Sequence, residues 1–311
     1  MTAKDSLTIA WSPSSFGQAD AAPFRLLEAA GVEVRPNPFG RRLTADEAIE
    51  HLQGVDGLIA GLEPLDARVL ASAPQLKAIA RVGIGVDNID HAAAAEHGIA
   101  VSNTPDPPAE SVAELTITAA LALLRGLLPA NNALHRGEWA KAISPGLRGT
   151  TVLLVGFGRI GQAVHRRLEA FDAEVLVSDP AVEDGGESGV EFVNLDEGLA
   201  RAAVVSLHAG GRERILGERE FGLLREGAVL LNSARGELMD EKALVDALDD
   251  GSVAGAWLDV FVDEPYSGPL CDYPQVLLTP HVGTYTLACR REMETLATLN
   301  VLRDLGVELD G

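Results

Sequence analysis

Short apolar runs alternate with amphipathic segments along the first third of the chain, and this pattern predicts its secondary structure. The apolar runs have the length of buried strands and occupy residues 7–11, 57–60, 76–82 and 99–102. The segments whose apolar residues recur at helical spacing occupy 21–30, 44–53, 66–72 and 88–97. Strands that alternate with helices in this way predict a parallel, doubly wound sheet.

The alternation begins again at Thr151 and predicts a second sheet. Its strands are expected at residues 151–155, 174–178, 203–207, 228–232, 253–258 and 276–279. A long helix is expected between the two sets of strands, over 111–128, because Ser111 and Glu114 have the spacing of a capping box. Apolar residues from Leu287 to Leu302 recur at helical spacing, so we expect a final helix that packs on the first domain.

Together these elements predict an α/β protein with two doubly wound parallel-sheet domains of the Rossmann or flavodoxin-like type. The length of 311 residues fits two domains better than one compact core. The first domain is expected to be discontinuous, with residues 1–102 and 285–311, because the final helix returns to it. The second domain is expected to contain residues 103–284.

Composition narrows the class of partner. A net charge of −21 disfavours nucleic acid and anionic membranes, since both require a basic surface. The sequence has no apolar run of membrane-spanning length and no signal-peptide core at its start, so we expect a cytoplasmic protein with no membrane partner. Cys271 and Cys289 have neither metal nor redox spacing, so we expect no metal. An anionic substrate would have to be bound by locally placed arginines.

The segment TVLLVGFGRIGQAV carries the strongest local signal. An expected strand leads into Gly156, Gly158 and Gly161 at the spacing of a dinucleotide-binding loop, and an amphipathic helix follows. Gly156 permits the tight turn, Gly158 lets the pyrophosphate approach the backbone, and Gly161 permits close helix–strand packing. Asp179 ends the next strand and would accept hydrogen bonds from the ribose hydroxyls, and no Arg or Lys follows within four residues. NAD is therefore favoured over NADP; a structural turn without nucleotide is the alternative.

Ligands of such sheets bind at the carboxyl ends of the strands, where several ionisable residues are expected. His281 ends one strand, and Glu264 lies in the loop after the strand before it. A lone histidine at a strand end is more often a loop hydrogen-bond residue. A carboxylate beside the imidazole reverses that preference, because it raises the histidine pKa and makes a proton available near neutral pH.

Three more residues follow strands of the second domain. Arg235 alone would be a salt-bridge residue, but beside a nicotinamide it could hold a substrate carboxylate through a bidentate fork. Asp259 fits a strand-end cap as well as it fits a contact with the cofactor's carboxamide. His208 ends another strand and borders the expected cofactor cleft. We therefore assign His208 and Asp259 to the cofactor site, together with the loop residues Arg159, Ile160 and Ala234.

Several blocks of the sequence are similar to those of the D-isomer-specific 2-hydroxyacid dehydrogenase family, especially its phosphoglycerate-dehydrogenase-like branch. They are RVGIGVDNID, NTPDPPAESVAELTI, LVGFGRIGQAV, NSARGELMDE, LDVFVDEP and LLTPHVGTYT, in family order over most of the chain. The resemblance implies a substrate domain, the discontinuous one, and an NAD-binding domain, with the active site in the cleft between them. It also implies a homodimer formed around the helix near 111–128.

The same resemblance implies a role for each matching residue. His281 would protonate the ketone oxygen as NADH delivers hydride, and Glu264 would keep the imidazole protonated and oriented. Arg235 would bind the substrate carboxylate or carbonyl. Backbone N–H groups of the turn Val82, Gly83 and Ile84 would assist, and Arg81 matches a basic position that phosphoglycerate dehydrogenases use.

Two departures from the family pattern leave the NAD affinity and the identity of the substrate open. The segment after His208 lacks the family's Pro-Leu-Thr-Pro core, so NAD affinity could differ. The segment IAGLEPLD lacks an arginine that phosphoglycerate dehydrogenases often carry there. Glu264 argues against a formate-dehydrogenase-like member, which would have Gln.

The sequence thus predicts an NAD-dependent D-2-hydroxyacid dehydrogenase or 2-oxoacid reductase that acts on a small anionic 2-hydroxy or 2-oxo acid. Oxidation of 3-phosphoglycerate is one candidate reaction, and reduction of glyoxylate or hydroxypyruvate is the alternative. From another class, an NAD(H)-sensing binding or corepressor-like protein could retain the same residues.

Overall fold

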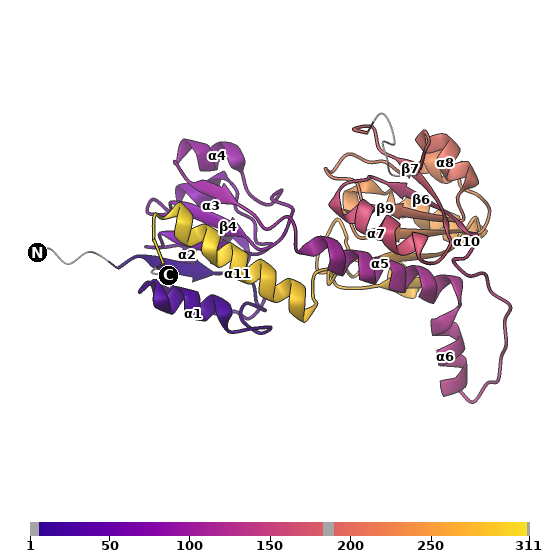
Figure 1. The fold of residues 1–311 in the computed structure, drawn as a ribbon, viewed down its shortest axis with the longest axis horizontal. Helices are drawn as coiled ribbons and strands as arrows, with labels where there is room; N and C mark the ends of the chain where they lie inside the picture. Colours follow the sequence, from indigo (N-terminus) through magenta and orange to yellow (C-terminus); the bar gives the residue numbers. More distant parts are fainter. Residues whose placement is uncertain (1–5, 183–189, 310–311) are drawn as a thin grey trace, which may run out of the picture. The chain divides into compact units, whose positions relative to one another are not determined.

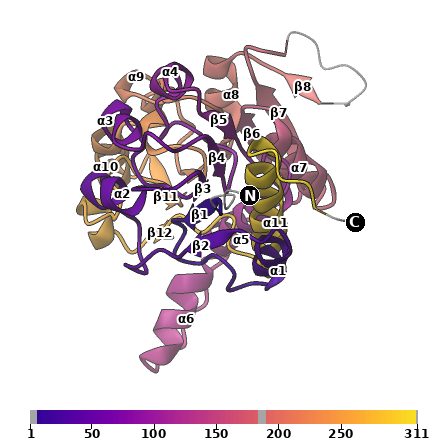
Figure 2. The same ribbon diagram turned by 90° about the vertical axis from the view of Figure 1, so that its left-hand side faces the viewer.

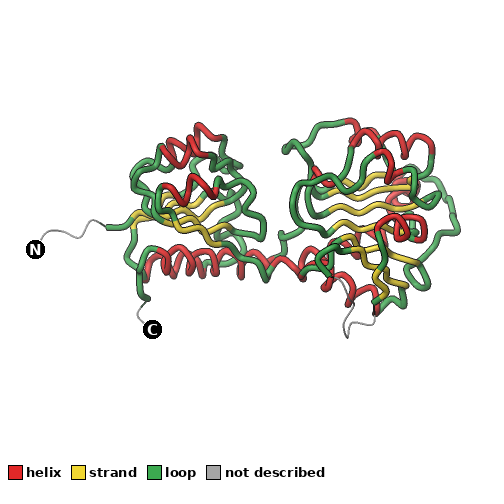
Figure 3. The backbone as a smooth tube through the Cα atoms, turned by 90° about the horizontal axis from the view of Figure 1, so that it is seen from above, coloured by secondary structure: helices red, strands yellow, loops and turns green. Residues whose placement is uncertain are grey.

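The computed structural model describes residues 6–182 and 190–309, and the chain divides into two compact units (Figure 1). Unit 1 comprises Met1–Pro108 and Thr284–Gly311, and unit 2 comprises Ala109–Gly283. Each unit contains one parallel sheet with helices packed on it, which confirms the predicted α/β fold class (Figure 3). The expected domain boundaries lay after residues 102 and 284.

The sheet of unit 1 has the strand order β2-β1-β3-β4-β5. Its strands are β1 (Thr8–Trp11), β2 (Glu33–Arg35), β3 (Gly57–Ala60), β4 (Ala78–Arg81) and β5 (Ala100–Ser102). Its helices are α1 (Ala22–Ala29), α2 (Ala45–His51), α3 (Ala67–Ala71), α4 (His91–Glu96) and α11 (Leu287–Asp304). The edge strand β2 was not predicted, because its short, largely exposed sequence Glu-Val-Arg contains no apolar run.

Side chains of neighbouring residues in the central strands pack on opposite faces of this sheet. Leu58 packs in a cluster with residues of α2, α3 and α4, whereas Ile59 packs with residues of α1 and α11. Figures 1 and 2 show α1 and α11 together. Because helices cover both faces of the sheet, its strands are continuous apolar runs and do not alternate between apolar and polar residues. The final helix therefore packs on the first sheet, as its spacing predicted.

The sheet of unit 2 has the order β12-β11-β10-β9-β6-β7-β8. Its strands are β6 (Thr151–Val155), β7 (Glu174–Ser178), β8 (Glu191–Phe192), β9 (Val204–Leu207), β10 (Ala228–Asn232), β11 (Val253–Leu258) and β12 (Val276–Leu278). Its helices are α5 (Pro108–Leu124), α6 (Leu127–His135), α7 (Arg159–Glu169), α8 (Leu195–Arg201), α9 (Glu218–Phe221) and α10 (Glu241–Asp250), with 3-10 turns at Gly236–Leu238 and Pro269–Asp272. Chain order reverses between β6 and β9, which makes their carboxyl ends the expected ligand site.

The helix expected over 111–128 differs from the observed one at both ends. It begins at Pro108, whose fixed φ suits the first turn of a helix, and the Ser111 hydroxyl instead donates to the Gly283 carbonyl at 2.7 Å. The predicted capping box is therefore wrong. Gly126, with φ of 56°, separates α5 from α6, and the two helices are bent by 62°. Within the described residues no single helix is long and apolar enough to cross a membrane; this bent pair passes that test by length and composition only.

Candidate active site

The glycine loop joins β6 to α7 at the reversal of strand order. Gly156 has φ of 97°, and a Cβ there would lie 2.6 Å from the Ala209 nitrogen. A Cβ on Gly161 would lie 2.3 Å from the Gly156 carbonyl oxygen, so both glycines are required by close backbone approach. A Cβ on Gly158 would meet nothing within 4 Å. Gly158 is exposed and precedes the first turn of α7, so it leaves open the space where a helix N-terminus binds phosphate.

Asp179 follows β7 and ties the glycine loop to the neighbouring strand. Its Oδ2 accepts the Phe157 N–H at 2.7 Å, and its Oδ1 accepts the Ala181 N–H at 2.9 Å. Each carboxylate oxygen keeps a further acceptor site, so Asp179 also fits the expected contact with ribose hydroxyls. Glu183, the last of the four residues after it, lies outside the described residues. The loop and Asp179 thus fit an NAD molecule.

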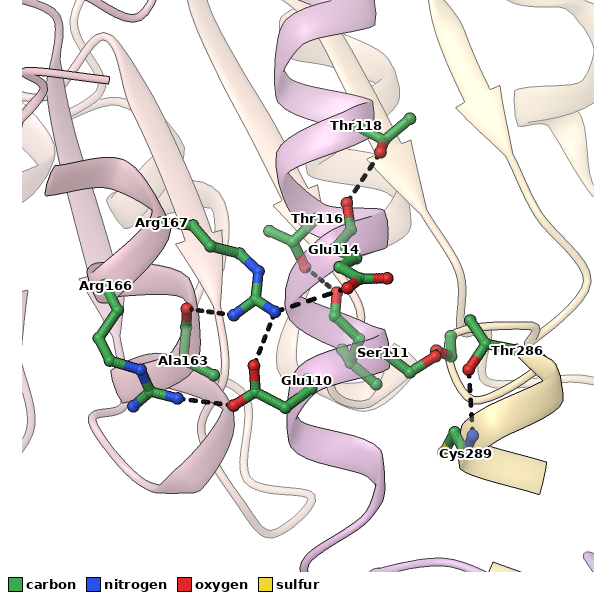
Figure 4. Close-up of polar contacts among 12 residues, drawn as sticks. Glu110, Ser111, Glu114, Thr116, Thr118, Ala163, Arg166, Arg167, Thr286 and Cys289 are labelled. Atoms are coloured by element: carbon green, nitrogen blue, oxygen red, sulfur yellow. Dashed lines mark hydrogen bonds and ion pairs between the residues drawn. The ribbon is translucent and has the colours of Figure 1, made fainter. Parts of the chain in front are cut away.

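Ion pairs hold α7 against α5 (Figure 4). Glu110 at the start of α5 accepts two hydrogen bonds from α7. Arg166 Nη2 donates to its Oε1 at 2.6 Å, and Arg167 Nη2 donates to its Oε2 at 2.7 Å. The Arg167 guanidinium lowers the pKa of the Glu110 carboxyl. Because the Glu110 and Arg166 side chains are more than half exposed and Arg167 is partly buried, each pair contributes about 0–1 kcal/mol, and their effect is mainly to fix how α7 lies on α5.

The structure brings Glu264 and His281 together. His281 Nδ1 lies 3.1 Å from both carboxylate oxygens of Glu264, and Oε1 also accepts the Phe261 N–H at 3.2 Å. His281 follows β12 with φ of 54°, a left-handed conformation that is uncommon outside glycine. In the part of the chain that the structure describes, His281 Nε2 has no hydrogen-bond partner. An imidazole held through Nδ1 in this way can present Nε2 to a reacting oxygen.

Asp259 fixes the backbone on either side of His281. Asp259 is 1% exposed. Its Oδ1 accepts hydrogen bonds from the Thr279 hydroxyl at 2.6 Å and from the Val282 N–H at 2.8 Å. Its Oδ2 accepts a hydrogen bond from the Gly283 N–H at 2.8 Å. Burial raises the pKa of Asp259, and these donors act against that rise. Such contacts account for the strand-end role, whereas a contact with the cofactor's carboxamide stays a prediction.

Arg235 lies in a tight turn after β10. The Asn232 side chain closes this turn, donating to the Arg235 carbonyl at 2.9 Å and accepting the Ala234 N–H at 3.0 Å. A Cβ on Gly236 would lie 2.3 Å from the Phe261 carbonyl carbon. The turn that carries Arg235 is therefore pressed against the loop that carries Glu264.

His208 follows β9 and lies beside the glycine loop, where a Cβ on Gly156 would come 2.7 Å from the His208 carbonyl carbon; its expected place in the cofactor site stays a prediction. The backbone N–H of His208 donates to the Val155 carbonyl at 2.7 Å, and its ring Nε2 lies 2.9 Å from the Ser206 hydroxyl. Burial lowers the pKa of His208 to about 4, so the ring is neutral. We did not predict Ser206 as its partner, although residues two apart in a strand share a face.

The residues expected to bind substrate through unit 1 follow β4. The Val82 N–H donates to the Ala60 carbonyl at 2.9 Å, and the Gly83 N–H donates to the Thr104 hydroxyl at 2.7 Å. These two N–H groups are committed to the fold, which corrects the expectation that all three face a substrate. Among described residues the Ile84 N–H has no partner, so its role stays a prediction.

A dinucleotide loop at a strand-order reversal, with a carboxylate-bound histidine on the same sheet, is typical of NAD-dependent oxidoreductases. Residues 117–283 match the family model described as "D-isomer specific 2-hydroxyacid dehydrogenase, NAD binding domain". The chain belongs to this family, whose members oxidise the CH–OH group of 2-hydroxy acids, and its cofactor is NAD. No cluster of metal-ligating side chains occurs within residues 6–182 and 190–309.

Two relatives that the chain resembles carry different names. The chain is 38% identical over 296 residues to a D-3-phosphoglycerate dehydrogenase of Methanocaldococcus jannaschii, covering 92% of this chain and 56% of that protein. It is 35% identical over 272 residues to a glyoxylate reductase of Thermococcus litoralis, covering 82% of each. The solved structure of the TT0316 protein from Thermus thermophilus matches with a TM-score of 0.87 and 34% identity, over 98% of this chain and 99% of that one. The chain thus spans little more than half of the phosphoglycerate dehydrogenase it resembles.

Proposed function

We propose that the protein reduces a small 2-oxo acid with NADH to the D-2-hydroxy acid, with His281 as the general acid. The observation that carries this proposal is the contact of His281 Nδ1 with both oxygens of Glu264 at 3.1 Å. Glu264 accepts a hydrogen bond from Nδ1–H, which keeps the proton on Nδ1 and fixes the direction of the ring. In the opposite direction, His281 acts as the base.

The other proposed roles follow from the chemistry of the side chains. Bound NADH supplies the hydride. His281 Nε2 donates a proton to the carbonyl oxygen of the substrate, and Arg235 holds the substrate carboxylate through its guanidinium. Asp259 keeps the His281 turn in place through Thr279, Val282 and Gly283.

Turnover of a panel of 2-oxo acids tests this proposal. NADH oxidation, followed by absorbance, is expected on addition of glyoxylate, hydroxypyruvate, phosphohydroxypyruvate or a related acid. His281→Ala is expected to lower kcat at least about a hundredfold, because general-acid catalysis contributes roughly 10²- to 10⁴-fold, while the Kd for NADH stays within about twofold. His91→Ala, which changes an exposed histidine of α4, is the matched control and should leave both unchanged.

Each contrary outcome has its own meaning. Loss of NADH binding in His281→Ala would identify the histidine as a structural residue. Tight NADH binding by the unaltered protein, without turnover of any 2-oxo acid, would favour the NAD(H)-sensing alternative.

We also propose that the protein forms a homodimer through α6 and the segment after it. Leu127, Leu134, Trp139 and Ile143 are large apolar residues exposed on this part of unit 2. An apolar pocket at the base of α6 is lined by Leu123, Leu128, Pro129, Val229 and Leu277. A single chain rarely exposes so much apolar surface, and a second copy would cover it. Light scattering should give twice the chain mass, and Trp139→Glu with Ile143→Glu should give the monomer.

The cytoplasmic location and the absence of nucleic-acid or membrane partners stay predictions.

A further inference from the structure

Trp257 is a buried residue of β11 whose ring makes a polar contact inside an apolar cluster. It is 1% exposed and packs with residues of α5 and α7. Its indole Nε1–H donates to the Thr279 hydroxyl oxygen at 3.0 Å. Phenylalanine would fill much of the same apolar space, so the N–H group is what tryptophan adds at this position.

The Thr279 hydroxyl connects this indole to Asp259. Thr279 Oγ1 in turn donates to Asp259 Oδ1 at 2.6 Å. An indole N–H can only donate, so its presence at Oγ1 leaves the hydroxyl proton directed at the carboxylate. Successive hydrogen bonds also polarise one another, which strengthens the second bond. Trp257, Thr279 and Asp259 therefore form one hydrogen-bond chain.

The hydrogen-bond chain ends on the backbone that follows His281. Asp259 accepts the Val282 N–H through Oδ1 and the Gly283 N–H through Oδ2, each at 2.8 Å. A Cβ on Gly283 would lie 3.0 Å from Oδ2, so the carboxylate lies directly against this backbone. Burial raises the pKa of Asp259, and the Thr279 hydroxyl is the strongest of the groups that lower it again. The hydroxyl thus helps Asp259 to remain a carboxylate that accepts both N–H groups.

We infer that Trp257 is a positioning residue for His281 and acts through the hydrogen-bond chain. His281 has φ of 54°, and a left-handed backbone at a residue other than glycine persists only where its surroundings hold it. Asp259 holds the two residues after it, while Glu264 holds the ring through Nδ1. Without the indole N–H, the Thr279 hydroxyl can turn away from Asp259, and the imidazole loses its fixed direction. This inference rests on the proposed 2-oxoacid reductase activity and adds a residue to its machinery.

Trp257→Phe tests the inference, because it removes the indole N–H and keeps an aromatic ring in the cluster. The quantities to measure are kcat, for a 2-oxo acid that the unaltered enzyme reduces, and the Kd for NADH. We expect kcat to fall about tenfold, the order of one hydrogen bond, while the Kd for NADH changes less than about threefold. Val204→Ala is the matched control, since it shortens a buried residue of the same cluster at the start of β9. It should lower the Tm and leave kcat unchanged.

A double substitution shows whether Trp257 acts through Thr279. Thr279→Val should lower kcat at least as much as Trp257→Phe does. The double variant should have the kcat of Thr279→Val alone, because the hydrogen-bond chain is already broken there. Thr279→Ser keeps the hydroxyl and should stay within about threefold of the unaltered enzyme. Losses that multiply in the double variant overturn the inference, as does a Kd for NADH that rises as much as kcat falls.

Nitrogen NMR of the imidazole gives a readout that needs no turnover. At a pH where the ring is neutral, the ring nitrogen shifts of His281 should show the proton on Nδ1 in the unaltered protein. Trp257→Phe should increase the share of the form with the proton on Nε2, and an unchanged share with unchanged kcat overturns the inference. If Trp257→Phe does not fold, Thr279→Val decides by the same two measurements, because it breaks the next link. Absence of turnover by the unaltered protein overturns the proposed function, and the NMR comparison then decides the inference alone.

Discussion

Gly158 and Gly161 belong to one motif, yet the structure assigns them different physical duties that single substitutions can separate. A Cβ on Gly161 would lie 2.3 Å from the Gly156 carbonyl oxygen, well inside van der Waals contact. Since the obstacle is backbone, α7 or the loop must move by several tenths of an ångström. Such overpacking costs about 1–3 kcal/mol. For a unit of this size, that cost corresponds to a fall in Tm of roughly 2–12 °C.

Gly158→Ala has the opposite expectation. Gly158 has φ of −71°, which alanine adopts without strain, and its Cβ would meet nothing within 4 Å. Alanine caps a helix less well than glycine, but it also loses less backbone entropy on folding, and the two effects, each up to about 1 kcal/mol, largely cancel. The Tm should therefore change by less than about 3 °C. The methyl group would occupy the space in front of α7, so we expect the Kd for NADH to rise at least about tenfold, or 1.4 kcal/mol.

Calorimetry without cofactor gives both Tm values, and titration of NADH fluorescence gives both Kd values. Gly161→Ala should have a lower Tm than the unaltered protein. Gly158→Ala should have a nearly unchanged Tm but a higher Kd for NADH. Equal destabilisation by both variants, with unchanged NADH binding by Gly158→Ala, would refute the assignment of this loop to phosphate binding.

Three further predictions concern the same unit. Asp179→Ala should weaken NADH binding about tenfold and NADPH binding less, since a 2′-phosphate gains from removal of the carboxylate; equal losses would contradict the ribose contact. His208 has a folded pKa of about 4 and an ordinary value of 6.5, so the unfolded chain binds its proton first as pH falls. The contribution of neutral His208 to stability is therefore present above pH 6.5 and is lost toward pH 4. Urea unfolding should give a free energy of unfolding about 2 kcal/mol lower at pH 5 than at pH 7.5. In His208→Asn this part of the pH dependence of stability should be absent. Thr279→Val removes one donor to Asp259 and should lower kcat more than it raises the Kd for NADH; the reverse order would argue against positioning of His281.

Much of the fold could be predicted because its strands are buried on both faces. Runs such as residues 57–60 and 228–232 are apolar almost throughout, and every residue of β3 and β10 is buried. The edge strand β2 could not be predicted, since an edge strand packs few apolar side chains. The helix start at Pro108 was missed because Ser111 and Glu114 have the spacing of a capping box, whereas tertiary structure commits the Ser111 hydroxyl to Gly283.

The site was predictable where its chemistry follows local spacing, and not where it depends on distant contacts. Glu264 lies in the loop after β11 and His281 follows β12, so their meeting follows from the pairing of β11 with β12. The N–H groups of Val82 and Gly83 gave no sign that Ala60 and Thr104 would use them.

The bond between Ser111 and Gly283 bears on how such a chain could arise. Unit 2 begins at Ala109 and ends at Gly283, and the Ser111 hydroxyl lies 2.7 Å from the Gly283 carbonyl oxygen. The two ends of unit 2 therefore lie close together, although the whole of its sheet separates them in sequence. A module with adjacent ends can be inserted into a surface connection of another fold without stretching it. Unit 1 has the form of a host that is interrupted once after β5, and unit 2 fills that interruption as one continuous segment.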